Sequence, residues 1–169
     1  TPNLEKFFKE QALYDLTESE KITALKLLEL QRHAMLMYTS CGWFFDDLSG
    51  IETAQVIQYA GRVVQLAQEL FGNETEAHFL ELLEKAESNI PAQGDGRSIY
   101  ENYVKPAMVD LTRVVAHYAV SSLFEEYSDE SRVNCYLIHN EDYQTAECGK
   151  ARLIVGRAKI TSEITGESD

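Results

Sequence analysis

The fold class of this chain follows from residues 51–70, which read IETAQVIQYAGRVVQLAQEL. Apolar side chains recur along this stretch at spacings of three and four, which is the period of a helix with one buried face. The apolar positions are Val56, Ile57, Ala60, Val63, Val64, Ala67 and Leu70. Ser49-Gly50 precedes the stretch and Gly72-Asn73 follows it, so we expect a long helix from Ile51 to Leu70.

A second helix is expected on the amino-terminal side. Thr17 and Glu20 have the spacing of a capping box, in which the Thr hydroxyl accepts from a backbone N–H and the Glu carboxylate reaches back. The apolar residues that follow have a helical period and predict a helix over residues 18–39. Gly42 is the expected helix breaker before the long helix.

Two further helices are expected on the carboxy-terminal side. Asn73 and Glu76 offer a second capping box, which predicts a helix over residues 74–87. Apolar residues with the same period predict another helix over residues 107–126.

From Arg132 onward the apolar period changes to two, which is typical of strands. We expect one strand over residues 132–138 and another over residues 151–162, with residues 142–147 as a short strand or as the connection. Two or three strands alone are marginal in water. The strands must therefore pack on the helices or pair with chain outside this sequence.

The predicted fold class is mainly α, a bundle of four to five helices followed by a small antiparallel β unit. Residues 1–128 are expected to form the helical bundle, and residues 129–169 a β hairpin or small sheet. The chain opens Thr1-Pro2 without an initiator Met, which indicates either a processed protein or a piece of a longer one.

The composition excludes several classes of function. Lys plus Arg number 15 against 28 Asp plus Glu, a formal net charge of −13, which argues against binding to nucleic acid or to an anionic membrane. No apolar run approaches the roughly 18 residues of a membrane span, and no signal-peptide pattern opens the sequence. Three cysteines are too few for a disulfide scaffold, so we expect reduced thiols in a cytoplasmic protein.

No metal or cofactor site is expected. A di-iron site in a helical bundle uses Glu-x-x-His, but His33, His78 and His117 have no Glu three residues before them. The sequence also lacks the paired cysteines of a zinc knuckle, a dinucleotide fingerprint, a Walker loop and a Gly-x-Ser-x-Gly elbow.

Residues 31–52, QRHAMLMYTSCGWFFDDLSGIE, are rich in side chains that can bind a ligand. They include the only tryptophan, Trp43, within three consecutive aromatic residues, followed by Asp46 and Asp47. An aromatic ring covers the apolar face of a pyranose while carboxylates accept hydrogen bonds from its hydroxyl groups, so this pattern favours a sugar-binding site. In the structural alternative the aromatics cap the core and one Asp caps the next helix.

The candidate substrate-binding residues form a main set and a weaker set. The main set comes from the connection between the helices predicted over residues 18–39 and 51–70 and from the first turn of the second helix: Cys41, Trp43, Phe45, Asp46, Asp47 and Glu52. The weaker set comes from the preceding helix and from the loop over residues 89–98: Arg32, His33, Asp95 and Arg97. For this loop, the structural alternative is a mobile segment with a helix cap at Ser98. No nucleophile and base stand together, so no catalytic residue is assigned within this chain.

The stretch from Met35 to Asp47, continued by residues 49–53, resembles a domain of unknown function that follows the catalytic barrel in proteins related to glycoside hydrolase family 57, which are α-amylase-like. Its most specific part is Cys-Gly-Trp-Phe-Phe-Asp, residues 41–46. The similarity covers nearly the whole chain through shorter motifs: Gln58-Tyr59-Ala60, Gly94-Asp95-Gly96-Arg97, His117-Tyr118-Ala119, Gly156-Arg157 and Ile164-Thr165-Gly166.

The resemblance implies a role in carbohydrate chemistry. In family 57 enzymes a distorted parallel barrel carries a Glu nucleophile and an Asp acid/base, and a helical region after it adds aromatic and acidic residues to the α-glucan cleft. Trp43, Asp46 and Asp47 match that contribution. Nothing here matches the barrel motifs. Adjacent Asp residues are also a poor retaining pair, since such a pair faces across about 5 Å.

We therefore expect a non-autonomous accessory domain of an α-glucan-active glycoside hydrolase or transferase. Its expected partners are the catalytic barrel of the same parent chain and an α-glucan or related carbohydrate. A second hypothesis is a purely structural or protein-interaction domain that uses residues 43–45 as a docking surface. An autonomous enzyme is a third and weaker reading.

Overall fold

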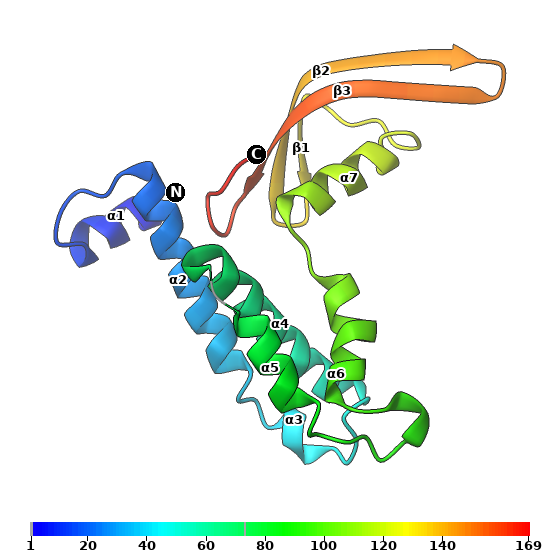
Figure 1. The fold of residues 1–169 in the computed structure, drawn as a ribbon. Helices are drawn as coiled ribbons and strands as arrows, with labels where there is room; N and C mark the ends of the chain where they lie inside the picture. Colours follow the sequence, from blue (N-terminus) through cyan, green and yellow to red (C-terminus); the bar gives the residue numbers. More distant parts are fainter. Residues whose placement is uncertain (1, 73) are drawn as a thin grey trace. The chain divides into compact units, whose positions relative to one another are not determined.

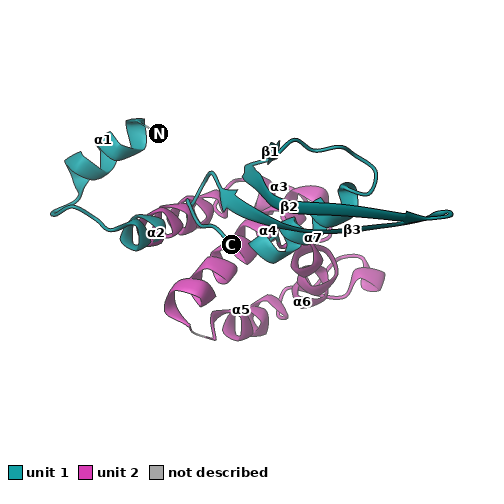
Figure 2. Cartoon of the chain, turned by 90° about the horizontal axis from the view of Figure 1, so that it is seen from above, with its two compact units in different colours: residues 1–22, 109–169 teal, residues 23–108 magenta. Residues whose placement is uncertain are grey.

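The computed structural model describes residues 2–72 and 74–169. It is mainly helical, with a three-stranded antiparallel sheet near the carboxy terminus, so the predicted fold class is confirmed (Figure 1). The chain divides into two compact units (Figure 2). Residues 23–108 form the helical unit, and residues 1–22 with 109–169 form the sheet unit. The boundary predicted from the sequence, after residue 128, follows the change from helices to strands and stays a prediction.

The helical unit is built on α4 (Ile51–Phe71), the helix predicted from the opening stretch. Its buried side reads Thr53, Ile57, Ala60, Gly61, Val64, Leu66 and Ala67. Ile57 packs in a core with residues of α5 (Thr75–Leu83), α6 (Gly96–Ile99) and the π-helical turn η2 (Tyr100–Val104). The central member of this core is Tyr100, whose side chain is fully buried.

α2 (Glu18–Leu36) begins at the predicted capping box, which is confirmed. Thr17 N donates to Glu20 Oε2 at 2.8 Å, and Glu20 N donates to Thr17 Oγ1 at 3.3 Å. The predicted end at Thr39 is wrong, because the N–H groups of Tyr38 and Thr39 bond only three residues back and tighten the last turn. Gly42 is not the breaker either.

Gly42 lies inside a separate one-turn helix, α3 (Cys41–Phe44). A Cβ at this position would lie 3.0 Å from Val56 Cγ2, so the glycine permits α3 to approach α4 closely. Its role is therefore packing rather than termination of a helix.

Two other predicted helices are shorter than expected. α5 ends at Leu83 rather than near residue 87. The helix stops there because the N–H groups of Lys85 and Ala86 bond to carbonyl groups only three residues back. In the capping box predicted for its start, Asn73 lies outside the described residues. In the sheet unit, α7 (Leu111–Ser121) begins only after Asp110, whose side chain accepts from Arg113 N at 2.7 Å and so caps the helix.

The sheet unit contains α1 (Pro2–Gln11), α7 and the strands β1 (Glu130–Val133), β2 (Tyr136–Cys148) and β3 (Ala151–Ser162) in the order β1-β2-β3. The strand predicted over residues 151–162 is confirmed. The single strand predicted over 132–138 is wrong, because Asn134 takes a φ of 53° in a tight turn and Val133 pairs with Tyr136. Asn is one of the few residues that accept this left-handed conformation.

α7 covers one face of the sheet. Val114 and Tyr118 of the helix pack against Ile138 of β2 and Ile160 of β3, all nearly fully buried. β2 and β3 continue beyond α7 as a long two-stranded hairpin (Figure 1). The strands thus pack on a helix, as the sequence required, but only over the half nearest the core.

Candidate functional site

The main predicted set lies on one connection of the helical unit, from α3 to the first turn of α4. α3 is held by short backbone bonds: Trp43 N donates to Ser40 O at 3.1 Å and Phe44 N to the same oxygen at 2.9 Å. With Gly42 against Val56, this fixes the backbone from which the aromatic side chains project.

The aromatic side chains of this connection face solvent. Trp43 is 76% exposed, Phe44 72% and Phe45 47%, and the two Phe rings meet edge to face at 5.2 Å. Tyr38, immediately before α3, is 85% exposed. These residues do not cap the core of the helical unit, which is formed by other side chains. We call Tyr38 and Trp43–Phe45 the aromatic surface.

Asp47 is held by hydrogen bonds on both carboxylate oxygens. Oδ1 accepts from Ser49 N at 2.7 Å and from Ser49 Oγ, while Oδ2 accepts from Ser88 Oγ at 2.9 Å and from Asn89 N at 2.7 Å. These donors, those of Ser49 first, lower the pKa of Asp47 to about 2. Asp47 is therefore an ionised brace between two loops, and no oxygen is left without a donor.

The other members of the main set are less constrained. Asp46 is exposed, and its backbone oxygen accepts from the Asn89 side chain. Cys41 is an exposed free thiol. Glu52 is half-buried in the first turn of α4, where a negative charge favours the helix. The carboxylate of Asp46 is thus the acidic group beside Trp43 that has the most freedom to bind a ligand.

Asp95 and Arg97 reach the same region indirectly. Ser88, which binds Asp47, also donates its backbone N–H to Gly94 O at 3.0 Å. The Asp95 side chain accepts from Ser98 N at 2.8 Å, so Asp95 and not Ser98 caps α6. Arg97 is engaged with Glu84 and Glu101. The structure therefore assigns the loop pair to capping and surface ion pairs.

Arg32 and His33 belong to a separate charged cluster with Glu29, which is 8% exposed. Arg32 binds Glu29 through two nitrogens, at 2.8 Å and 2.7 Å, and His33 Nε2 lies 3.0 Å from Glu29 Oε1. The His33 ring faces Tyr59 of α4 at 5.7 Å. Glu29 was not among the predicted site residues, although it stands four positions before His33 on the same helix face.

Burial of His33 and the hydrogen bonds of Arg32 to Glu29 set the protonation of this cluster. Burial lowers the pKa of His33 below its ordinary value, against the opposing effect of Glu29. The bidentate bond from Arg32 lowers the pKa of Glu29. His33 Nδ1 is buried and has no hydrogen-bond partner among the described residues. His33 is thus neutral near pH 7, and its ring contacts Tyr59 of α4.

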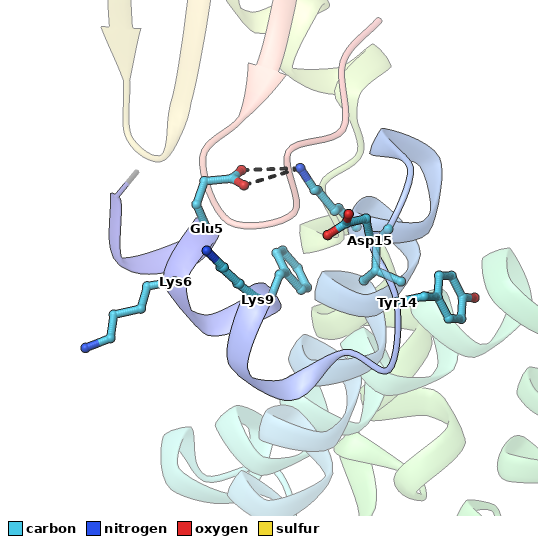
Figure 3. A pocket seen from close by; sticks show the side chains of 8 residues that line it. Glu5, Lys6, Lys9, Tyr14 and Asp15 are labelled. Carbon is cyan, nitrogen blue, oxygen red and sulfur yellow. Dashed lines mark hydrogen bonds and ion pairs between the residues drawn. The ribbon is translucent and has the colours of Figure 1, made fainter.

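The sheet unit contains an open pocket of about 460 Å³ between α1 and the start of α2 (Figure 3). Lys21 crosses it to Glu5 at 3.3 Å and also binds Glu18 at 2.9 Å. Lys6 points away from the pocket (Figure 3). Glu5 and Lys21 therefore form an ion pair within the pocket lining, and no sequence pattern pointed to this pocket.

The described parts of the chain show neither a metal-binding cluster nor a membrane-spanning helix. Residues 2–72 and 74–169 hold no group of three or more His, Cys, Asp or Glu arranged for a metal ion. Over the same residues, no helix has the length and apolar character needed to cross a membrane. The arrangement at the aromatic surface can bind a ligand or a protein through ring faces and hydrogen bonds.

Comparison with known proteins identifies a family for the chain. No curated protein and no solved structure gives a significant match to the chain. A family model described as a domain of unknown function, DUF3536, matches residues 1–169. Since the match spans the entire sequence, the chain belongs to the DUF3536 family.

Proposed function

We propose that this chain is a non-catalytic accessory domain of a carbohydrate-active enzyme related to glycoside hydrolase family 57. In this proposal the aromatic surface forms one wall of an α-glucan cleft, and the catalytic barrel of the parent protein forms the other. The observation that carries the proposal is the exposure of Trp43, 76%, beside the unengaged carboxylate of Asp46. A ring with a free face and an adjacent carboxylate suit a pyranose.

The ionised, fully hydrogen-bonded carboxylate of Asp47 supports a domain that binds substrate without catalysing the reaction. A general acid must hold a proton near neutral pH, but the pKa of Asp47 is about 2 and its oxygens are occupied by Ser49, Ser88 and Asn89. Asp47 then keeps the connection rigid while Trp43 and Asp46 contact the sugar. This changes the part assigned to Asp47 from ligand contact to support.

The test is steady-state kinetics of the full-length parent protein on a soluble maltooligosaccharide. Trp43→Ala is expected to lower kcat/KM at least about tenfold, a loss of about 1.4 kcal/mol of transition-state binding, while Trp43→Phe keeps most of the activity. Phe71→Ala removes an exposed ring, 60% exposed at the far end of α4 from the aromatic surface, and is the matched control, which should keep the wild-type kinetics. Unchanged kinetics with a lowered melting temperature would assign Trp43 a structural role and reject the proposal.

A second candidate function is protein docking through the same surface. Trp43 and Phe44 are neighbours in α3 and are 76% and 72% exposed, and Phe45 beside them is 47% exposed. This favours a surface that another protein region covers. Loss of association with the parent barrel in Trp43→Ala, with no change in sugar affinity, would select this function.

A further inference from the structure

β3 presents a free edge. It lies at the end of the order β1-β2-β3, and in the described part of the chain residues 151–159 pair with β2 alone. Beyond them the edge is occupied, because Ile160 exchanges backbone hydrogen bonds with Asp169 and Thr161 forms a bridge with Ser168. A free edge of this length is a template for pairing with another strand.

The hydrogen bonds of Ile160 identify the backbone groups that face the free edge. Ile160 N donates to Asp169 O at 2.8 Å, and Asp169 N donates to Ile160 O at 3.0 Å, so the polar groups of Ile160 point away from β2. Successive residues of an antiparallel strand alternate in this direction. The even-numbered residues 152–158 therefore point N–H and C=O outward, and the odd-numbered residues point them toward β2.

The hairpin also has an uncovered apolar face. Ile154 lines a small cavity with Tyr118 of α7 and so faces the helix. Leu153 and Val155 project from the opposite face, where they are 61% and 60% exposed. The free edge and the uncovered apolar side chains therefore both lie within residues 151–159.

We propose that β3 pairs with β3 of a second copy of this chain, antiparallel and about a two-fold axis at Ile154. In this register Ile154 exchanges backbone hydrogen bonds with Ile154 of the second copy. Leu153 lies directly opposite Val155 of the second copy, and such apolar cross-strand pairs stabilise a sheet. The contact is isologous and closes as a dimer. It involves a different surface from the aromatic surface and does not rest on the proposed function.

Charge and hydrogen bonding favour this register over the one about the midpoint between Ile154 and Val155. Residues 150–159 read KARLIVGRAK, with four cations and no acid. This stretch reads nearly the same in both directions about the point between Ile154 and Val155. Pairing about that point would place Arg152 opposite Arg157 of the second copy. It would also place a residue whose N–H and C=O point outward opposite one whose groups point toward β2, which an antiparallel ladder does not allow. With the two-fold axis at Ile154, Arg152 lies opposite Gly156 of the second copy, and Arg157 lies opposite Ala151 of the second copy. No two cations are then directly opposed.

The length of the free edge supports the same register. Pairing covers residues 151–157 in both copies, and the turn of the second copy at Gly149 reaches Lys159. A shift by two residues, to an axis at Val155, would bring that turn to Thr161, which is already bridged to Ser168. A hollow of about 570 Å³ beside this end of β3, lined in part by Ala158 and Asp169, leaves room for the turn.

The first test is sedimentation velocity of the full chain over a wide concentration range. The wild-type sedimentation coefficient is expected to rise with concentration to that of a dimer. Val155→Lys puts a cation into the shared apolar row and is expected to remain monomeric. Val120→Lys, on α7, is the matched control, because Val120 is also 60% exposed and lies off the edge; it should dimerise as the wild type does. A wild type that stays monomeric overturns the proposal, as does a dimer that Trp43→Ala abolishes and Val155→Lys leaves intact.

The second test reads the register. In a background with Cys41, Cys135 and Cys148 replaced by Ser, a 1:1 mixture of Leu153→Cys and Val155→Cys chains is oxidised gently. The mixture is expected to form disulfide dimers several times faster than either variant alone, because residues 153 and 155 are directly opposed while 153 and 153 are diagonal and out of disulfide range. Equal rates in the three samples would reject the register about Ile154.

Discussion

Ser88 Oγ donates a hydrogen bond to Asp47 Oδ2 at 2.9 Å, across 41 positions of sequence. The neighbouring N–H of Asn89 donates to the same oxygen at 2.7 Å. One carboxylate thus joins the connection before α4 to the loop after α5. Since Trp43 and Asp46 lie on the first of these segments, the position of the aromatic surface depends on a residue that need not touch a ligand.

Replacement of Asp47 by Asn is expected to lower stability in a pH-dependent way. The folded pKa of Asp47, about 2, lies below its ordinary value of 3.8, so its stabilising effect is complete above about pH 4 and is lost as the pH falls toward 2. The melting temperature of Asp47→Asn should fall below that of the wild type at pH 7, and the gap should close between pH 4 and 2. The exposed Asp46→Asn is the control. Parallel curves for Asp47→Asn and wild type would show that the hydrogen bonds do not favour the charged form.

Replacement of Glu29 by Gln is expected to destabilise the helical unit. Glu29 is 8% exposed and accepts from both Arg32 and His33, so the neutral side chain loses charge-assisted hydrogen bonds worth about 1–3 kcal/mol together. Urea unfolding measures the change. Glu69→Gln is the control, since Glu69 pairs with Lys26 at 3.2 Å but is 36% exposed at its side chain. An equal loss in the free energy of unfolding for the two variants would mean that the burial of Glu29 does not strengthen its hydrogen bonds.

His33 is expected to give the protein a loss of stability on mild acidification. Burial lowers the folded pKa of His33 below its ordinary value of 6.5. The unfolded chain therefore binds the proton first, and stability falls as the pH drops below about 6.5. Between pH 7 and 5 the free energy of unfolding should fall less steeply in His33→Gln than in the wild type. His78→Gln, whose side chain is 75% exposed, should follow the wild-type slope; if His33→Gln does so as well, His33 is not the group responsible.

The fluorescence of the protein is expected to report the aromatic surface directly. Trp43 is the only tryptophan and is 76% exposed, so its emission should lie close to that of free tryptophan and be quenched by acrylamide almost as efficiently. Phe45→Ala, which leaves the indole in place, is the control and should change little. A blue-shifted, protected emission in the wild type would mean that Trp43 is covered.

The local features of the fold could be predicted because neighbouring residues decide them. The Thr17–Glu20 capping box and the strand over residues 151–162 depend on side chains a few positions apart, and both are confirmed. The break at Asn134 was missed for a similar local reason: the alternation of apolar residues continues through it, and only the left-handed conformation of Asn divides the strand.

The environment of the candidate site could be predicted only in part. The sequence located the exposed aromatic residues, since Trp43–Phe45 stand between two helices. It could not show that Asp47 is bound by Ser88 and Asn89, because that contact joins distant loops whose approach depends on the packing of α5. Nor could it show that Arg97 is held by Glu84, 13 positions away. Spacing alone does not separate a ligand-binding carboxylate from a bracing one.

The division of the chain into units has a consequence for its synthesis. Residues 23–108 are continuous, whereas residues 1–22 join a unit that needs residues 109–169. At ordinary translation rates residues 109–169 take a further roughly 3 to 12 s to be made, long enough for the helical unit to fold before the last strand exists. Residues 1–22 meanwhile lack residues 109–169, with which they form the second unit. A nascent chain stalled after residue 108 should therefore resist protease within the helical segment and be cleaved before Ile22.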